Sequence, residues 1–110
     1  MTNHVRIIEV GPRDGLQNER AQVPLDAKVA FINALSASGL RDIEATSFVS
    51  PKAVPQLADA DEVMQRIARH DGVRFHALVP NERGYERALA ARIDTVALFT
   101  SATEAFCEAN

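Results

Sequence analysis

The sequence contains little cysteine, no excess of basic residues and no long hydrophobic run. The single cysteine among 110 residues, Cys107, excludes an internal disulfide and a cysteine-based zinc cluster. Lys and Arg number 12 against 15 Asp and Glu, and the resulting net charge of −3 argues against a nucleic-acid partner. Because no apolar run approaches the roughly 20 residues that span a bilayer, we expect no membrane partner.

The remaining composition is typical of one soluble globular domain. Hydrophobic residues make up 46% of the chain and charged residues 25%, a balance that argues against disorder. No linker or low-complexity stretch divides residues 1–110, so we treat them as one unit. The first six residues have neither the apolar core of a secretory signal nor the Arg- and Ser-rich composition of a transit peptide, which favours a cytoplasmic location.

Short apolar runs alternate with helix-like segments. The predicted strands are Val5–Val10, Asp42–Phe48, Phe75–Val79 and Thr95–Phe99. The first predicted helix begins at Pro24 and ends before Gly39. The second runs from Leu57 to Asp71-Gly72. The third follows Asn81, which caps it, and carries Ala88, Leu89 and Ile93. In the first helix, Leu25, Val29, Ile32 and Leu35 recur in steps of four, three and three, which places them on one face. This alternation predicts parallel strands joined by helices, an α/β fold.

Two α/β architectures fit this pattern. A doubly wound sheet could be complete at this length, whereas a (β/α)₈ barrel typically needs about 250 residues. Ser101 and Glu104 have the spacing of a capping box, which opens a helix, although only six residues follow Glu104. Either the last turn is a short stub, or the chain stops partway through a fourth helix, and we expect the second.

The first candidate site follows the first predicted strand. Ligands in parallel α/β folds gather at the carboxyl ends of strands, and residues 9–19 lie at one. Gly11 and Gly15 allow a sharp turn around the polar residues between them. Arg13 offers a rigid fork of donors to an oxyanion, and Asp14 offers oxygen ligands to a divalent cation. The alternative is an ordinary solvated surface turn.

The second candidate is Glu44, a carboxylate inside the second predicted strand. A carboxylate in this position needs a cation or hydrogen-bond donors to offset its desolvation. Arg13, at the end of the neighbouring strand, is the simplest partner. The pair could serve a reaction, or it could only hold the sheet together.

The histidines and the cysteine indicate little. His4, His70 and His76 have no metal-ligand spacing, and we expect structural roles for them, with His70 in the last turn of the second helix. Cys107 has no neighbouring cation, so an inert thiol is expected.

Three segments carry a resemblance to a known family. They are EVGPRDGLQNE at 9–19, EATSFVSPK at 44–52 and VPQ at 54–56. Together they resemble the hydroxymethylglutaryl-CoA lyase family, and the resemblance runs through all 110 residues. Related Claisen-type synthases share Arg-Asp-Gly but not the Gly-Pro before it or the Leu-Gln-Asn-Glu after it. Because the family fold is a (β/α)₈ barrel, the resemblance implies that residues 1–110 are a truncated N-terminal portion of such a barrel, about four βα units.

The resemblance also implies an activity and roles for individual residues. The reaction is the cleavage of 3-hydroxy-3-methylglutaryl-CoA, an acyl-CoA formed in leucine breakdown, to acetyl-CoA and acetoacetate, assisted by Mg²⁺ or Mn²⁺. Asp14 would be a metal ligand. Arg13 would contact the thioester oxygen and stabilise the enolate, and Glu44 would orient Arg13 or take part in proton transfer. Gln17 and Ser47 would help to bind the substrate.

Other parts of the family's site do not occur in these 110 residues. The family pattern includes a His-Xaa-His pair, an asparagine and a cysteine in a glycine-rich loop, and Cys107 does not lie in that motif. We therefore expect the 110-residue chain alone to be inactive, and the full-length protein to be a homo-oligomer, namely a dimer. Two alternatives are a related synthase, and a non-catalytic half-barrel that self-associates to bury its open edge.

Overall fold

The computed structural model describes residues 3–100 and residue 102. The elements are β1 (Ile8–Glu9), η1 (Gly11–Gly15), α1 (Leu25–Ala37), β2 (Asp42–Ser47), η2 (Pro55–Leu57), α2 (Ala60–Arg66), β3 (Arg74–Leu78), α3 (Glu82–Ala90) and β4 (Thr95–Ala97). η1 is a single π-helical coil and η2 a 3₁₀ turn. Within the described part of the chain, no helix has the length and apolar character needed to cross a membrane.

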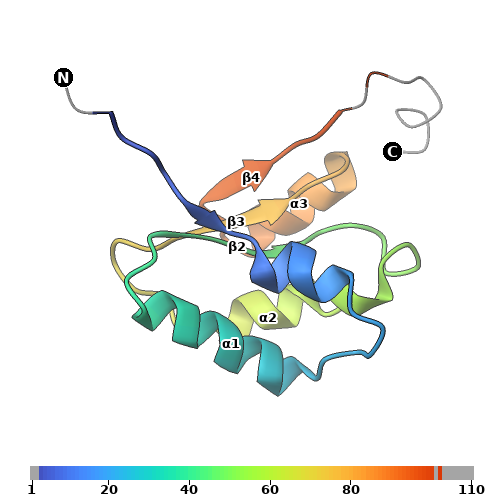
Figure 1. Ribbon diagram of the computed structural model, residues 1–110. Coiled ribbons are helices and arrows are strands. Elements are labelled where there is room, and N and C mark those ends of the chain that lie inside the picture. The colour runs from blue at the N-terminus through green and yellow to red at the C-terminus, as the bar shows by residue number, and fades with distance from the viewer. Residues whose placement is uncertain (1–2, 101, 103–110) are drawn as a thin grey trace.

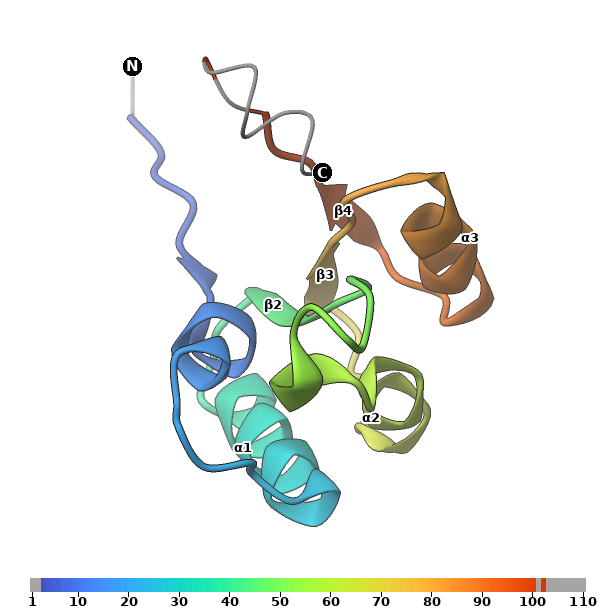
Figure 2. The same ribbon diagram turned by 90° about the vertical axis from the view of Figure 1, so that its right-hand side faces the viewer.

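The strands form one parallel sheet in the order β1-β2-β3-β4 (Figure 1). A doubly wound sheet would instead add strands on both sides of the first one. The three helices lie around one side of the curved sheet (Figure 2). Sequential parallel strands with every crossover helix outside follow the path of a (β/α)₈ barrel, so the order decides between the two predicted architectures.

Apolar side chains fill the space between the sheet and its helices. Ile43 from β2 and Phe75 from β3 are buried there with Ile32 from α1 and Val63 from α2. In β2, Ile43 belongs to this core, whereas Asp42 and Glu44 on either side of it are buried in ion pairs. Because neighbouring strand residues point to opposite faces, the face of β2 away from the helices is polar.

Several predicted boundaries are wrong. The first strand spans only Ile8–Glu9, and Val5 and Ile7 before it are exposed. The fourth strand ends at Ala97 rather than Phe99. Each is an edge strand of the described sheet, and pairing on one side only supports a shorter ladder.

The second helix is also shorter than predicted. Leu57 lies in the 3₁₀ turn η2, and α2 ends at Arg66 because Ile67 is extended, with ψ 147°. His70 therefore lies beyond the helix and not in its last turn. Leu89 in α3 is exposed, and Ile93 follows the end of that helix. The predicted helix at Ser101–Glu104 and the thiol of Cys107 lie outside the described residues.

Two helix ends are as predicted. Gly39 has φ 98°, the left-handed conformation that ends α1 after Ser38. The side chain of Asn81 accepts a hydrogen bond of 2.9 Å from the amide of Gly84 and so caps α3. Pro24 is expected to be the first helical residue, but α1 begins at Leu25 and Pro24 is the residue immediately before it.

Gly84 lets the first turn of α3 pack directly on the chain after β2. A Cβ at this position would lie 2.6 Å from the backbone oxygen of Phe48. We expect Gly84→Ala to destabilise the full-length protein by about 1–3 kcal/mol, although alanine is the better helix former. Thermal or urea unfolding measures the change. The control is Gly15→Ala, because a Cβ at Gly15 meets nothing within 4 Å. Equal stabilities of the two variants would contradict the prediction.

Candidate active site

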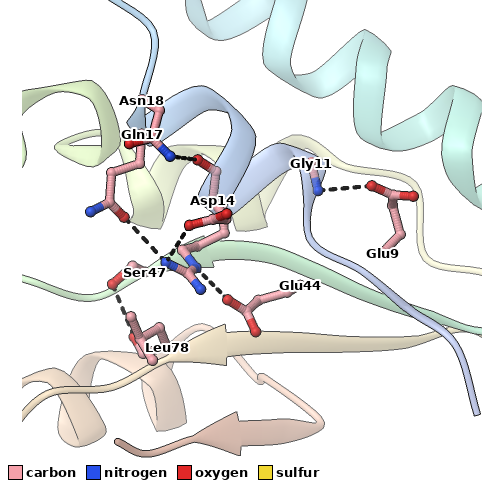
Figure 3. A network of polar contacts seen from close by, with 9 residues as sticks. Glu9, Gly11, Asp14, Gln17, Asn18, Glu44, Ser47 and Leu78 are labelled. Carbon is pink, nitrogen blue, oxygen red and sulfur yellow. Dashed lines mark hydrogen bonds and ion pairs between the residues drawn. The ribbon is translucent and has the colours of Figure 1, made fainter. Parts of the chain in front are cut away.

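η1 presents its side chains above the end of β2. The amides of Arg13, Asp14 and Gly15 all donate to the carbonyl oxygen of Val10, at 3.1, 2.7 and 3.3 Å. These bonds wind the chain into one tight coil immediately after β1. Figure 3 shows the side chains of Asp14 and Gln17, from η1 and the residues after it, on the side that faces Glu44.

Two side chains pack closely on Gly11 at the start of this coil. Its amide donates to Glu9 Oε1 at 2.9 Å, and a Cβ there would lie 2.9 Å from the same oxygen and 3.1 Å from Cζ of Phe31. The sharp turn expected around Gly11 and Gly15 is present, but it does not use the left-handed conformation that glycine allows. Among the described glycines only Gly39 and Gly72 have positive φ, and the π-helical coil needs none.

Arg13 and Glu44 form the central ion pair. Nε of Arg13 donates to Oε1 of Glu44, and the two side chains are 19% and 9% exposed. The predicted pairing across neighbouring strand ends is therefore confirmed. Shielding from water strengthens this charge-assisted bond, and it fixes where the rest of the guanidinium points.

The outer nitrogen of Arg13 is held only loosely. Nη1 lies 3.4 Å from Oδ1 of Asp14 and 3.3 Å from Oε1 of Gln17. Both contacts are at the long end of hydrogen bonding, so an incoming oxyanion can compete for this nitrogen. The Asp14 side chain itself is 55% exposed. The guanidinium is thus anchored on one side and available on the other.

Ser47 occupies the end of β2 but turns toward the neighbouring strand. It is fully buried, and its Oγ donates to the carbonyl oxygen of Leu78 at 3.2 Å. In this conformation the hydroxyl ties β2 to the end of β3. A contact of Ser47 with substrate stays a prediction.

The described residues contain one candidate ligand for a divalent ion and no complete site. The accessible carboxylate of Asp14 suits a hard cation. Within residues 3–100 and 102, no group of three or more His, Cys, Asp or Glu side chains could hold a metal ion. Further ligands would have to come from elsewhere in the protein.

A second buried ionic cluster surrounds Asp42 at the opposite end of β2. Its carboxylate lies 2.8 Å from Nε2 of His76, 3.1 Å from Nε of Arg74 and 3.4 Å from Nε of Arg6. The hydrogen bond with His76 is the main cause that lowers the pKa of Asp42, and the two arginines lower it further against the opposing effect of burial. The cluster joins the amino-terminal ends of the strands, the end of a barrel associated with stability. His76 has the structural role expected of it.

The lowered pKa of Asp42 predicts an acid-dependent loss of stability. Because the folded-state pKa lies below the unfolded-state value near 3.9, the stabilisation is present above about pH 4 and is lost as the pH falls through the folded-state pKa. Urea unfolding of wild type and Asp42→Asn should therefore show a difference in unfolding free energy that shrinks below pH 4. The exposed control, Asp26→Asn, should track wild type at every pH. A difference for Asp42→Asn that is independent of pH would contradict the assignment.

Comparison with known proteins agrees with this arrangement. The model of the HMGL-like family matches residues 4–110. The chain belongs to the HMGL-like family. It is 52% identical over 110 residues to the cytoplasmic 3-hydroxy-3-methylglutaryl-CoA lyase of Rattus norvegicus, covering all of this chain and 32% of that protein.

Solved structures of HMG-CoA lyases have the same fold over the matched region. The enzyme from Brucella melitensis has 59% sequence identity and a TM-score of 0.91, over 99% of this chain and 38% of that one. The enzyme from Acinetobacter baumannii, in complex with coenzyme A and 3-methylmalate, has 44% identity and a TM-score of 0.92, over 100% of this chain and 37% of that one. The chain thus spans about a third of the length of its relatives. The predicted fold, an α/β arrangement of four parallel strands that matches part of a (β/α)₈ barrel, is confirmed.

Proposed function

We propose that the full-length protein cleaves 3-hydroxy-3-methylglutaryl-CoA into acetyl-CoA and acetoacetate. The observation that carries the proposal is an arginine anchored by Glu44, beside an accessible Asp14, at the carboxyl ends of β1 and β2. We also infer that residues 1–110 form the N-terminal part of a barrel domain. The similarity to named lyases supports both inferences.

The reaction requires a cation where negative charge develops. The tertiary hydroxyl loses its proton and becomes the ketone of acetoacetate while the adjacent carbon–carbon bond breaks. The bonding electron pair moves into the acetyl thioester as an enolate, which then takes up a proton. Arg13 would donate to the enolate oxygen through the outer face of its guanidinium, while Glu44 holds the inner face. Gln17 lies beside the same guanidinium, and we assign it and Ser47 to substrate binding.

The HMGL-like family is typically metal-dependent, and we propose Mg²⁺ or Mn²⁺ for this protein. Such an ion would make the substrate hydroxyl more acidic. Asp14 would supply one oxygen ligand.

The acyl-CoA partner is supported by the coenzyme A in the Acinetobacter structure. Relatives are named as cytoplasmic and as mitochondrial enzymes, and we propose the cytoplasm here. We also propose a homodimer, which light scattering would test.

A coupled assay of purified full-length protein tests the function. Acetoacetate and acetyl-CoA should appear in equal amounts, EDTA should abolish their release, and added Mg²⁺ or Mn²⁺ should restore it. The isolated 110-residue chain should release neither product, because its described residues do not complete a metal site. Absence of cleavage by the metal-supplied full-length protein would overturn the proposal.

Asp14→Asn tests the metal ligand separately. We expect the metal concentration for half-maximal activity to rise by about 10–100-fold, because the substitution replaces a charged oxygen ligand with a neutral amide. Titration of the EDTA-treated enzyme with Mn²⁺ measures the change, and calorimetry checks the affinity directly. Asp26→Asn removes an exposed carboxylate elsewhere and should leave the titration unchanged. Identical metal titrations for the two variants would remove Asp14 from the metal site.

A further inference from the structure

Lys28 is a buried cation that the proposed reaction does not use. Its side chain is 6% exposed, and Nζ donates to the backbone oxygen of Gln56 and, at 2.7 Å, to Oδ1 of Asp59. Lysine is almost never buried to this extent unless it is paired. Because the side chain is almost fully buried, the ammonium depends on these two acceptors to offset its desolvation. Lys28 therefore fixes the main chain around η2 against α1.

Gln56 extends this connection to a second segment. Its side-chain Nε2 donates to the backbone oxygen of Glu19 at 3.1 Å. Glu19 lies in the connection between η1 and α1, whereas Gln56 lies in the connection between β2 and α2. Lys28 holds the main chain of Gln56, and the side chain of Gln56 in turn holds the main chain of Glu19. The three residues join two connections that are distant in the sequence.

Both connections lead directly to the site residues. The chain leading to Glu19 leaves η1, which carries Arg13, and the chain leading to Gln56 leaves β2, which carries Glu44. The Arg13–Glu44 bond joins the two elements at the site itself. The bonds of Lys28 and Gln56 connect the chain after η1 to the chain after β2 a second time, at Glu19 and Gln56.

We propose that Lys28 is a positioning residue that acts through Gln56 to hold η1, and with it Arg13, at the reacting end of the sheet. The inference rests on the proposed lyase function for its kinetic consequence. Without the ammonium, the oxygen of Gln56 and the carboxylate of Asp59 lose their common donor, and the chain around η2 relaxes. The bond to Glu19 is then lost, and η1 keeps the Arg13–Glu44 bond to β2 but loses its second connection to the segment that follows β2.

The test uses Lys28→Met and Gln56→Ala in the full-length protein. Lys28→Met removes the charge but keeps an unbranched side chain, whereas Gln56→Ala removes only the bond to Glu19. Arg66→Gln is the matched control, because Arg66 also joins α2 to α1 through an exposed 3.0 Å pair with Asp26. We expect kcat to fall by about 10–100-fold in the first two variants with KM within about threefold, and no change in the control. Activity is measured well below each variant's unfolding temperature, so lost stability alone does not lower kcat.

Amide hydrogen exchange measures how firmly η1 is held, and this measurement does not depend on enzyme activity. The amides of Arg13, Asp14 and Gly15, which donate to Val10, should exchange about tenfold faster or more in Lys28→Met and Gln56→Ala but not in Arg66→Gln. A lower unfolding temperature with unchanged exchange in η1 would overturn the proposal, as would equal changes in all three variants. If wild type releases no acetoacetate, the lyase function fails, and the exchange rates alone then decide the role of Lys28.

Discussion

Replacing Arg13 by glutamine in the full-length protein is expected to lower kcat by about 10²–10³-fold while KM changes only a few-fold. The guanidinium is anchored by Glu44 on one side and weakly occupied on the other, so it can meet an oxygen that gains charge during bond cleavage. Such a donor stabilises the enolate more than the neutral thioester. Its loss therefore raises the barrier and has little effect on ground-state binding.

Steady-state kinetics with saturating metal measure this effect. Arg66→Gln makes the same chemical change at an exposed ion pair and should retain wild-type kinetics. A loss for Arg13→Gln that appears entirely in KM would assign Arg13 to substrate binding rather than to enolate stabilisation. Circular dichroism of both variants verifies that the fold is retained.

Glu44→Ala has the second large expected effect, on both stability and turnover. The carboxylate is 9% exposed, and its removal leaves Nε of the partly buried Arg13 without the carboxylate oxygen that accepts its hydrogen bond. Breaking a buried pair in this way costs about 3–5 kcal/mol of unfolding free energy. Only the long contacts of Nη1 then orient Arg13, so we expect kcat to fall by roughly 10²-fold. Urea unfolding and initial rates measure the two effects.

Glu44→Gln distinguishes two roles for this residue, the orientation of Arg13 and participation in proton transfer. The amide oxygen can still accept a hydrogen bond from Arg13 but cannot take a proton in the way a carboxylate does. A kcat within about tenfold of wild type would assign Glu44 to the orientation of Arg13. A kcat as low as that of Glu44→Ala would instead indicate proton transfer. Wild-type kinetics in both variants would exclude Glu44 from the machinery.

Much of the site was accessible from the sequence because its chemistry is unusual for its position. A glutamate between Ile43 and Ala45 in a predicted strand requires a partner, and an arginine at the neighbouring strand end can supply one. The Arg13–Glu44 bond has that arrangement. The roles of these residues in catalysis, and those of Asp14, Gln17 and Ser47, stay predictions.

Lys28 was missed although the sequence carried a signal. It lies three residues after Leu25 and four before Ile32, and so on the apolar face of the helix. A lysine in that stripe indicates a buried partner. Its acceptors, the backbone oxygen of Gln56 and the carboxylate of Asp59, come from a segment about thirty residues away, which helical periodicity cannot identify.

The amino-acid sequence by itself determined the alternation of strands and helices and the ends marked by Gly39 and Asn81. These features depend on local periodicity, on backbone conformation and on hydrogen bonds within a few residues. Only the tertiary structure decided the strand order, the short edge strands, the coil at η1 and the network around Lys28. Each of these depends on which distant segments meet and on whether a strand has one neighbour or two, and no local pattern specifies such contacts.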